Sequence, residues 1–450
     1  MESAIGIDLG TTFSCVATIK PNGKPTVIAN FDGHNVTPSV VAYPTSKTLE
    51  PLVGKSAVKS SVPLENIIYD SKRFIGRQYN DESVQEDMKS WPFEIINDKG
   101  KPLVKLTHNN EEKKLAAEEI SAEVLKMMKK VAKKSLPNEQ KVTRAVITVP
   151  AHFDQRQRHS TMEAAKLAGI EVIRLVNEPT AVAIAYGVHN QGKKNVFIYD
   201  LGGGGQDFDR IIADYALENF KNFPRNNPKM MRRLIEECTE AKITLSCHGT
   251  ATIFVDNPAS DDGWKLILSR DKLNQLIGKK LYGTLSIVDK TLRTAKMKKT
   301  NIDIVILAGG STRILMVQDL LEKKFGKDKV WNKHNPDEVV AKGAALVAKS
   351  LTNSSSDSLQ LYFNDIVPLS IGQKIYGNKM LVAIPRGTKY PCKFEQNTIT
   401  SEDNQSFIPF TIYEDKNGIL NVTSIETANG NRASIQIQYD GCSHKDVIFQ

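Results

Sequence analysis

One order of elements occurs twice in this chain, and this internal duplication constrains its fold more than any other feature. An apolar strand that ends in Asp-Leu-Gly occurs at residues 4–10 and again at residues 195–204. Further along each half, a second apolar strand is followed by a helical pattern, at residues 144–168 and 302–325. A repeated alternation of strands and helices predicts two α/β lobes that face each other across a cleft. Ligands of such folds bind at the carboxyl ends of strands, where both Asp-Leu-Gly motifs lie.

The two halves differ directly after that motif. After residues 8–10 the first half returns through a second strand at residues 11–19, and Asn22-Gly23 is a strong hairpin signal. After residues 200–202 the second half passes through glycines into a helical pattern at residues 207–220. The return strand and its hairpin have no counterpart there, so we expect the second sheet to lack strands.

The pattern of apolar and polar residues changes near the end of the chain. A Ser- and Asn-rich stretch at residues 352–358 is typical of a linker, and alternating apolar and polar residues follow it. We therefore expect an α/β part at residues 1–351, a linker at 352–364 and a small all-β domain at 365–450, with no helix after it.

Composition restricts the class of protein and its partners. The 450 residues are 40% hydrophobic and 25% charged, which is typical of a globular protein. The net charge of +9 is dispersed along the chain, so we expect no nucleic-acid partner. No apolar run is long enough to cross a membrane, and the first strand begins so near residue 1 that we expect no leader. Five widely spaced cysteines favour a reducing compartment, so the expected location is cytoplasmic.

Three glycine-rich turns follow strands and could bind phosphate. They are Gly10-Thr11-Thr12, Gly202-Gly203-Gly204 and Gly309-Gly310-Ser311. Glycine lets the backbone approach a phosphate, and the exposed N–H groups of such turns bind anions. A Walker P-loop and a dinucleotide-binding fingerprint are both absent. Three ordinary tight turns are the alternative, but their equivalent places in a duplicated fold favour phosphate binding.

Carboxylates at the same places suit a metal ion. Asp8 and Asp200 end otherwise apolar strands, where a charge is costly unless it is paired or solvated by a metal. Two acids at a phosphate site suit Mg²⁺, which keeps much of its water. Glu178 opens a helix, where it could align a water or merely favour the helix dipole. Lys72, taken by itself, is an ordinary surface lysine.

Several long motifs together resemble the 70-kDa heat-shock protein family, the DnaK-type chaperones. The motifs are residues 6–17, the stretch around Lys72 and Arg73, and residues 145–158, 172–187, 200–204, 307–314 and 335–345. The resemblance implies a duplicated, actin-like ATPase domain followed by a peptide-binding β-sandwich domain. It also implies that ATP hydrolysis to ADP and phosphate is coupled to the capture of extended hydrophobic polypeptides. J-domain co-chaperones and nucleotide-exchange factors are the further partners that it implies.

The resemblance also implies roles for individual residues. Lys72 would contact the γ-phosphate and the attacking water, and Asp8, Glu178 and Asp200 would hold Mg²⁺ through its waters. The implied nucleotide-binding residues are Gly10, Thr11, Thr12, Gly202, Gly203, Gly204, Lys242, Ser246, Gly309, Gly310, Ser311, Arg313 and Asp337. Pro150 and Arg158 would relay the nucleotide state to the linker.

Departures from the family pattern predict weaker ATP hydrolysis and weaker peptide binding. The family's Thr-Phe-Asp and return strand are missing after residues 200–204, and Thr239 and Ile243 replace a Glu and an Arg of the adenosine pocket. The linker has Gln360 in place of an aspartate. The β domain lacks strands between Tyr413 and Asp415, and no helical lid is expected. We therefore expect impaired hydrolysis and an incomplete peptide site.

Two other functions remain open from the sequence. A small-molecule kinase can be built on the same duplicated fold, although the β-rich end has no use in such an enzyme. A non-catalytic chaperone remnant that acts only through interactions, or a faulty gene model, would also explain gaps that fall inside sheets.

Overall fold

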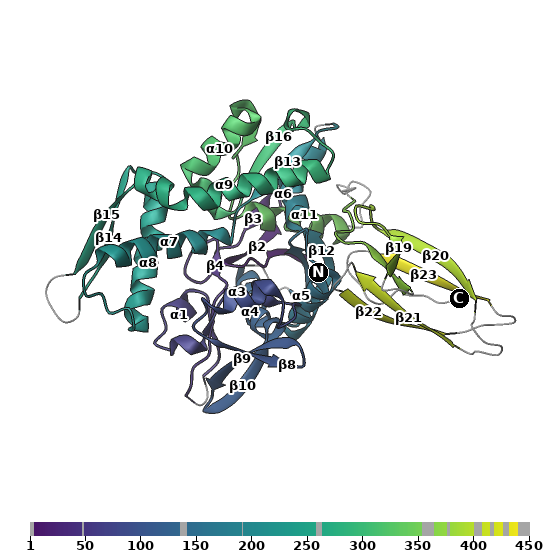
Figure 1. Cartoon of the computed structure of the whole chain (residues 1–450), viewed down its shortest axis with the longest axis horizontal. Helices are drawn as coiled ribbons and strands as arrows, with labels where there is room; N and C mark the ends of the chain where they lie inside the picture. Colours follow the sequence, from purple (N-terminus) through teal and green to yellow (C-terminus); the bar gives the residue numbers. More distant parts are fainter. Residues whose placement is uncertain are drawn as a thin grey trace. The chain divides into compact units, whose positions relative to one another are not determined.

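The computed structural model describes residues 4–46, 49–135, 142–190, 192–257, 263–352, 364–375, 379–399, 407–414, 418–425 and 432–439. Figure 1 follows the chain through its elements. Two compact units emerge, and each is described by itself. Unit 1 holds residues 1–9, 13–181 and 341–450, and unit 2 holds residues 10–12 and 182–340. Most of the predicted linker lies outside the described residues, and the predicted domain boundaries stay predictions.

The main sheet of unit 1 has the strand order β12-β11-β1-β2-β3, with β4 also pairing β2. The strands are β1 (Ala4–Asp8), β2 (Phe13–Ile19), β3 (Pro25–Val27), β11 (Arg144–Val149) and β12 (Glu171–Asn177). Strand β1 runs parallel to β11 and antiparallel to β2, and β11 runs parallel to β12. The predicted hairpin after the first Asp-Leu-Gly motif is thereby confirmed.

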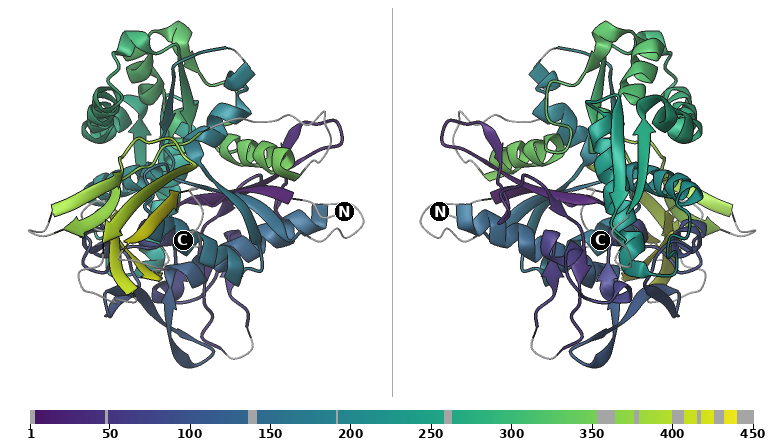
Figure 2. Two further views of the ribbon diagram at one scale, coloured as in Figure 1. Left: turned by 90° about the vertical axis from the view of Figure 1, so that its right-hand side faces the viewer. Right: turned by 90° about the vertical axis from the view of Figure 1, so that its left-hand side faces the viewer.

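Helices cover both faces of this sheet (Figure 2). Helices α4 (Ala117–Ser135) and α5 (Gln155–Leu167) share one apolar core with Ile5 and Ile7 of β1. Helix α11 (Val339–Thr352) packs on the other face, where Gly6 leaves room for its backbone at Ala345. Since successive strand residues point to opposite faces, the alternation in β1 explains this arrangement.

Local signals set the helix ends that matter for the site. Asp154 caps α5 by accepting a hydrogen bond from the Gln157 N–H, and the Gln157 side chain returns the interaction. Gly169 ends that helix region with φ +65°, a conformation that favours glycine. Helix α6 (Glu178–Ala185) then starts at the residue after β12.

Smaller elements complete unit 1. They are β4 (Thr37–Pro38), β5 (Val41–Ala42), β6 (Leu52–Val53), β7 (Ile67–Ile68), β8 (Glu94–Asp98), β9 (Lys101–His108), β10 (Glu111–Ala116), α1 (Lys55–Val58), α2 (Ser71–Phe74), α3 (Glu82–Met88) and the 3₁₀ turn η1 (Leu64–Asn66). They form two further antiparallel sheets, β6-β5-β7 and β10-β9-β8.

The end of the described chain is made of strands, as its alternating pattern predicts. The strands are β18 (Ile371–Ile375), β19 (Lys379–Ile384), β20 (Cys392–Ile399), β21 (Phe407–Glu414), β22 (Gly418–Ile425) and β23 (Arg432–Tyr439). They pair in the orders β19-β18-β21-β22 and β20-β23.

The sheet of unit 2 is shorter, with the order β13-β16-β17. Its strands β13 (Val196–Asp200), β16 (Ile304–Ala308) and β17 (Val330–Trp331) are parallel. Helix α7 (Gly204–Asn219) begins immediately after β13, so the expected absence of a return strand is confirmed within the described residues. The two units therefore repeat one parallel three-strand order, and the fold is a mixed α/β fold.

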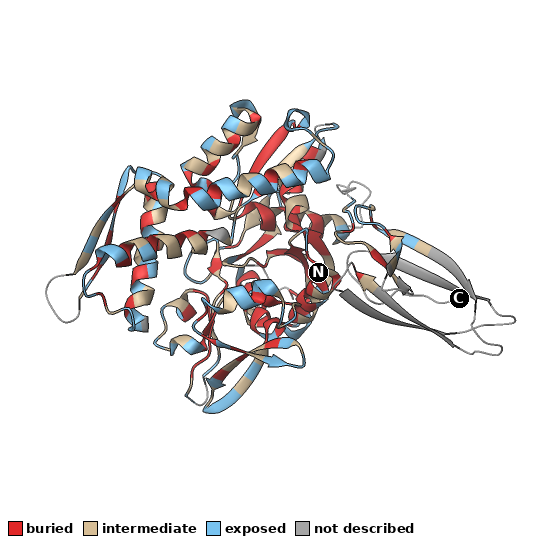
Figure 3. Cartoon of the chain, viewed as in Figure 1, coloured by how far each residue is buried: buried red, intermediate tan, exposed pale blue. Residues whose placement is uncertain are grey.

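The remaining elements of unit 2 enclose a second apolar core, part of the buried interior in Figure 3. They are η3 (Val188–Asn190), α8 (Pro228–Leu245), β14 (Thr250–Val255), β15 (Trp264–Ser269), α9 (Arg270–Thr294), η4 (Lys299–Asn301), η5 (Gly310–Arg313), α10 (Leu315–Phe325) and η6 (Lys327–Lys329). Among the helices of the described ranges, none combines the length and the apolar character that a membrane crossing requires.

Candidate functional site

Lys72 is held at the carboxyl edge of the main sheet of unit 1. Its Nζ atom donates hydrogen bonds of 2.5 Å to the Leu9 carbonyl oxygen and 2.5 Å to Oε1 of Glu178. The Lys72 and Glu178 side chains are only 9% and 16% exposed. The lysine that looks ordinary in the sequence is therefore a largely buried cation beyond the carboxyl end of β1.

The short helix α2 places this lysine. Asp70 precedes α2 in the left-handed conformation, with φ 58°, and its carboxylate accepts a hydrogen bond from Trp91. Arg73 adds ion pairs to Asp70 and to Asp87. A left-handed residue other than glycine is uncommon, so these contacts indicate a turn that its surroundings hold in place.

Two carboxylates share the edge that Lys72 occupies. Asp8 ends β1, and its Oδ1 atom accepts a hydrogen bond of 3.2 Å from the Thr148 hydroxyl of β11. Glu178 opens α6 at the end of β12. Since β1, β11 and β12 are parallel, their carboxyl ends lie on one edge, and the sequence placed both acids there correctly.

The donor set of unit 1 fits a hydrated cation better than a directly bound one. Asp8 and Glu178 offer oxygen ligands, which Mg²⁺ prefers. Within the described part of the chain, no group of three or more His, Cys, Asp and Glu side chains could hold a metal ion directly. Asp200 belongs to unit 2, so its expected share in a magnesium site stays a prediction.

Arg158 connects α5 to the residue before Glu178. It is 1% exposed, and its guanidinium donates 2.7 Å to Oδ1 of Asn177 and 3.1 Å to the Phe153 carbonyl. The sequence named Arg158 and Pro150 as a relay but missed Asn177. Asn177 could have been found from the sequence, because it is a polar residue at the end of an otherwise largely apolar strand.

In unit 2 the glycine loop after β13 is tied to the neighbouring turn. The Leu201 N–H donates 2.9 Å to the Ala308 carbonyl, and the Ser311 N–H donates 3.1 Å to the Leu201 carbonyl. The Gly205 N–H donates 3.2 Å to the Gly202 carbonyl as α7 begins. Backbone hydrogen bonds thus hold the loop although the return strand is absent.

The predicted phosphate turn at residues 10–12 contributes its threonines to unit 2. A Cβ atom added to Gly203 would lie 3.4 Å from the Thr11 Cβ, so the two loops are in close contact. The Thr12 hydroxyl is buried, and no partner for it exists among the described residues. A buried donor without a partner fits a bound acceptor such as a phosphate oxygen.

Lys242 reaches the same loop from α8. Its Nζ atom donates 2.9 Å to the Gly205 carbonyl and lies 2.7 Å from Oδ1 of Asp209. Asp209 is 5% exposed, and this burial raises the pKa of its carboxyl group while the Lys242 ammonium lowers it. The resemblance implies Lys242 as a nucleotide-binding residue, which stays a prediction, and Asp209 was not among the predicted residues. Ser246 caps the end of α8.

The third glycine turn positions Arg313 and Asp337. Gly309 has φ 78°, and Gly310 lies so close to the Asp337 carboxylate that an added side chain would force the carboxylate to move. The Arg313 guanidinium donates 2.9 Å to Oδ2 of Asp337 and 2.6 Å to Oδ1 of Asn335. A hollow of about 280 Å³ beside them is lined by Leu307, Thr312, Arg313, Gln318, Asn332, Lys333, His334, Asn335 and Pro336.

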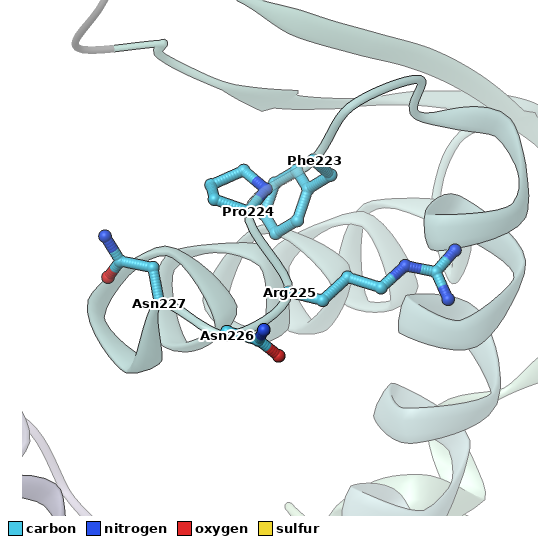
Figure 4. A pocket seen from close by; sticks show the side chains of 5 residues that line it. All are labelled: Phe223, Pro224, Arg225, Asn226 and Asn227. Carbon is cyan, nitrogen blue, oxygen red and sulfur yellow. The ribbon is translucent and has the colours of Figure 1, made fainter.

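Another hollow, of about 800 Å³, contains none of the predicted residues. It lies over the loop between α7 and α8 (Figure 4) and is lined by residues 223–227. Arg225 in this loop donates a hydrogen bond to the Leu217 carbonyl, which is a structural contact. This hollow therefore adds nothing to the candidate site.

Comparisons with known proteins identify the family. The model of the family described as Hsp70 protein matches residues 4–205 and 203–415. The chain belongs to the Hsp70 family. This membership confirms the resemblance stated from the motifs and the predicted class of function, a molecular chaperone of the 70-kDa type.

Individual Hsp70 relatives align with nearly the whole chain. A ribosome-associated molecular chaperone of Zygosaccharomyces rouxii is 36% identical over 508 residues, covering 97% of this chain and 82% of the relative. A ribosome-associated molecular chaperone of Saccharomyces cerevisiae is 35% identical with the same coverage. Heat shock cognate 70 kDa protein 3 of Dictyostelium discoideum is 36% identical, covering 97% of this chain and 76% of the relative.

The alignments also mark where this Hsp70 chain differs. The aligned length of 508 residues exceeds the 450 residues of the chain, so the relative carries segments that this chain lacks. The two stretches matched by the Hsp70 model meet at residues 203–205. Helix α7 begins at this place, where the sequence predicts a missing hairpin.

Proposed function

We propose that this protein is an ATP-dependent chaperone that binds ATP·Mg²⁺ and extended hydrophobic polypeptides, with hydrolysis below the level of its family. Hsp70 proteins bind ATP or ADP with Mg²⁺ and hydrolyse ATP. The observation that carries the proposal is the largely buried Lys72, which is fixed between the Leu9 carbonyl and Glu178 at the carboxyl ends of parallel strands.

The proposed chemistry needs positioning and positive charge at the γ-phosphate. Lys72 supplies an ammonium group with little freedom to move, because two acceptors hold it. Glu178 accepts from Lys72 and would orient the attacking water beside it. When bound, Mg²⁺ would neutralise part of the charge on the phosphates, and Asp8, Glu178 and Asp200 are its proposed holders through water.

The proposed nucleotide contacts are spread over the glycine turns and α8. Thr11, Thr12 and the glycine turns would donate N–H and hydroxyl groups to the phosphates, and Arg313 and Asp337 would contact the nucleoside. We expect weak binding of the nucleoside, since the Ile243 side chain is 55% exposed and offers no hydrogen bond. Thr239 uses its hydroxyl on the Ile235 carbonyl.

The proposal extends to an actin-like duplicated ATPase domain at residues 1–351, a linker at 352–364 and an incomplete peptide-binding β-sandwich at 365–450. Its partners would be unfolded polypeptides, J-domain co-chaperones and nucleotide-exchange factors in the cytoplasm, with neither nucleic acid nor membrane. The alternating strands β18 to β23 support a peptide-binding role for the last segment.

Calorimetry and single-turnover hydrolysis of the full chain test the proposal. We expect ATP to bind in the presence of Mg²⁺ and hydrolysis to fall by about 10²-fold or more in Lys72→Ala. Grafting the family's Thr-Phe-Asp hairpin after Gly204 should raise turnover in the otherwise unchanged chain. No ATP binding at millimolar nucleotide, or hydrolysis that is indifferent to Lys72→Ala, would contradict the proposal.

A second candidate is a non-catalytic interaction protein that works without nucleotide. The observation that favours it is Lys242, which is already committed to Asp209 and to the Gly205 carbonyl. Peptide binding that is unchanged by ATP, ADP or Lys72→Ala would support this candidate. Membership of the Hsp70 family gives no support to a small-molecule kinase.

A further inference from the structure

Strand β13 of unit 2 has an open edge where its counterpart in unit 1 is paired. Strand β1 has β11 on one side and β2 on the other, whereas β13 pairs only with β16 among the described strands. Ile5 and Ile7 of β1 are 0% exposed. Val196, Phe197 and Ile198 of β13 are only half-buried, as expected of an edge strand.

The backbone register shows which residues face the open side. The Leu201 N–H donates 2.9 Å to the Ala308 carbonyl, and the Asn195 carbonyl accepts from the Ile304 N–H at 3.4 Å. In a parallel ladder, alternate residues of a strand turn both backbone groups toward the same neighbour. The odd-numbered residues of β13 therefore face β16, and the N–H and C=O groups of Val196 and Ile198 face outward.

These outward groups are available for pairing. No described residue forms a hydrogen bond with the outward N–H or C=O groups of Val196 and Ile198. Both side chains are β-branched, and the strand carries no proline, so nothing in its sequence discourages a further strand. In unit 1 the equivalent edge accepts the antiparallel strand β2, which shows the orientation that such an edge takes up.

The charges at the ends of β13 select the partner. Lys194 precedes the strand and Asp200 ends it, and both residues are exposed. Consider an antiparallel pair in which Val196 lies opposite Ile198 of a second copy. In this register Lys194 lies opposite Asp200 of the second copy. Two-fold symmetry makes each of these pairs occur twice. Opposite charges across a strand pair stabilise that register.

We propose that the β13 edge is a self-association site, at which β13 of a second copy adds as an antiparallel strand. The site joins the two three-stranded sheets into one continuous sheet. The open backbone edge of β13 carries the site, and the charges of Lys194 and Asp200 set its register. Asp200 is also a proposed holder of Mg²⁺, so the test below measures association and not hydrolysis.

Sedimentation velocity of the full chain, measured at protein concentrations that span about a hundredfold range, tests this self-association site. We expect a reversible equilibrium between the 49.9 kDa chain and its dimer. Ile198→Pro removes one outward donor and leaves the bonds to β16 intact, so it should weaken the dimer by about tenfold or more. Lys194→Glu places like charges opposite each other and should weaken it without a risk to folding. Lys193→Glu is the matched control, since it makes the same charge change at an odd-numbered position.

Amide hydrogen exchange identifies the contact surface. In the dimer, exchange at residues 196 and 198 should slow as concentration rises. A chain that stays monomeric at every concentration overturns the proposal. So does a dimer that is equally stable in Lys194→Glu and Lys193→Glu, or protection of this edge by an added extended peptide without dimer formation.

Discussion

The Nζ atom of Lys72 lies 2.5 Å from Oε1 of Glu178, although 106 residues separate them in the sequence. Lys89 and Glu86 are also 2.5 Å apart, but their side chains are 71% and 72% exposed. The two ion pairs have the same length and differ mainly in burial. They therefore form a matched comparison within one chain.

The buried pair should show strong energetic coupling in a double-mutant cycle. Lys72→Met leaves the Glu178 carboxylate largely out of water without its partner, and Glu178→Gln does the same to the ammonium. We expect each change to lower the free energy of unfolding, with a coupling of about 1–2 kcal/mol between them. Urea titrations of the four proteins measure it.

The exposed pair supplies the control for this cycle. Water and salt screen Lys89 and Glu86, so the same cycle at Lys89→Met and Glu86→Gln should give a coupling below about 0.5 kcal/mol. Equal coupling in the two cycles would contradict a structural role of burial at Lys72.

Much of the fold follows from local signals in the sequence. The strands β1, β2 and β11 and the helix α10 lie where the apolar pattern predicts them, because the apolar residues of each element lie in a core. The missing return strand after β13 was also predictable, since the duplication supplies its own reference. The local sequence pattern is therefore sufficient to predict an element wherever the element's own residues determine its structure.

The site was less predictable because it depends on contacts between distant segments. Nothing near Lys72 in the sequence indicates that the Leu9 carbonyl and Glu178 will enclose it. Asp209 lies on an amphipathic helix, where an acid is usually solvated, and only packing of α7 on α8 buries it against Lys242. Such partners become visible only when the fold brings them together.

Gly343 should tolerate no side chain. It sits on α11, where an added Cβ would collide with the Ala181 carbonyl of α6. We expect Gly343→Ala to lower the free energy of unfolding by at least about 2 kcal/mol, because two backbones would have to separate. Gly283→Ala is the control, since an added Cβ on α9 meets nothing within 4 Å. That change should stabilise the protein by about 0.5–1 kcal/mol through helix propensity. Similar thermal shifts in the two variants would refute the close approach at Gly343.

Restoring the family's residues on α8 should strengthen nucleotide binding. Thr239→Glu and Ile243→Arg return a charged hydrogen-bonding pair to the proposed adenosine pocket. We expect the double variant to bind ATP about tenfold more tightly by calorimetry, which corresponds to one or two good polar contacts. Ile235→Arg lies on the same exposed stripe of α8 and should leave the affinity unchanged. An equal gain from Ile235→Arg would attribute the effect to overall charge and contradict the pocket.

Glu414, the last residue of β21, is buried against the start of α5. Its side chain is 2% exposed, and its Oε2 atom accepts a hydrogen bond of 2.7 Å from the Gln155 N–H. The pKa of Glu414 is raised from 4.5 to about 7, mainly by burial and to a smaller extent by the neighbouring Asp154. The Gln155 hydrogen bond, Arg158 and Arg156 lower it only in part.

This raised pKa predicts that the protein loses stability as pH rises from about 5 to 8. The folded protein binds more protons at Glu414 than the unfolded chain does between pH 4.5 and about 7. Its contribution is therefore fully present below pH 4.5 and is lost as pH rises through 7, by about 3 kcal/mol at most. Glu414→Gln, which keeps an acceptor for the Gln155 N–H without the charge, should flatten this dependence in urea titrations and be the more stable protein at pH 8. Glu163→Gln is the control, since Glu163 lies on helix α5 and its side chain is 41% exposed. This variant should keep the wild-type dependence of stability on pH. A wild-type slope in Glu414→Gln would show that Glu414 is not the titrating group.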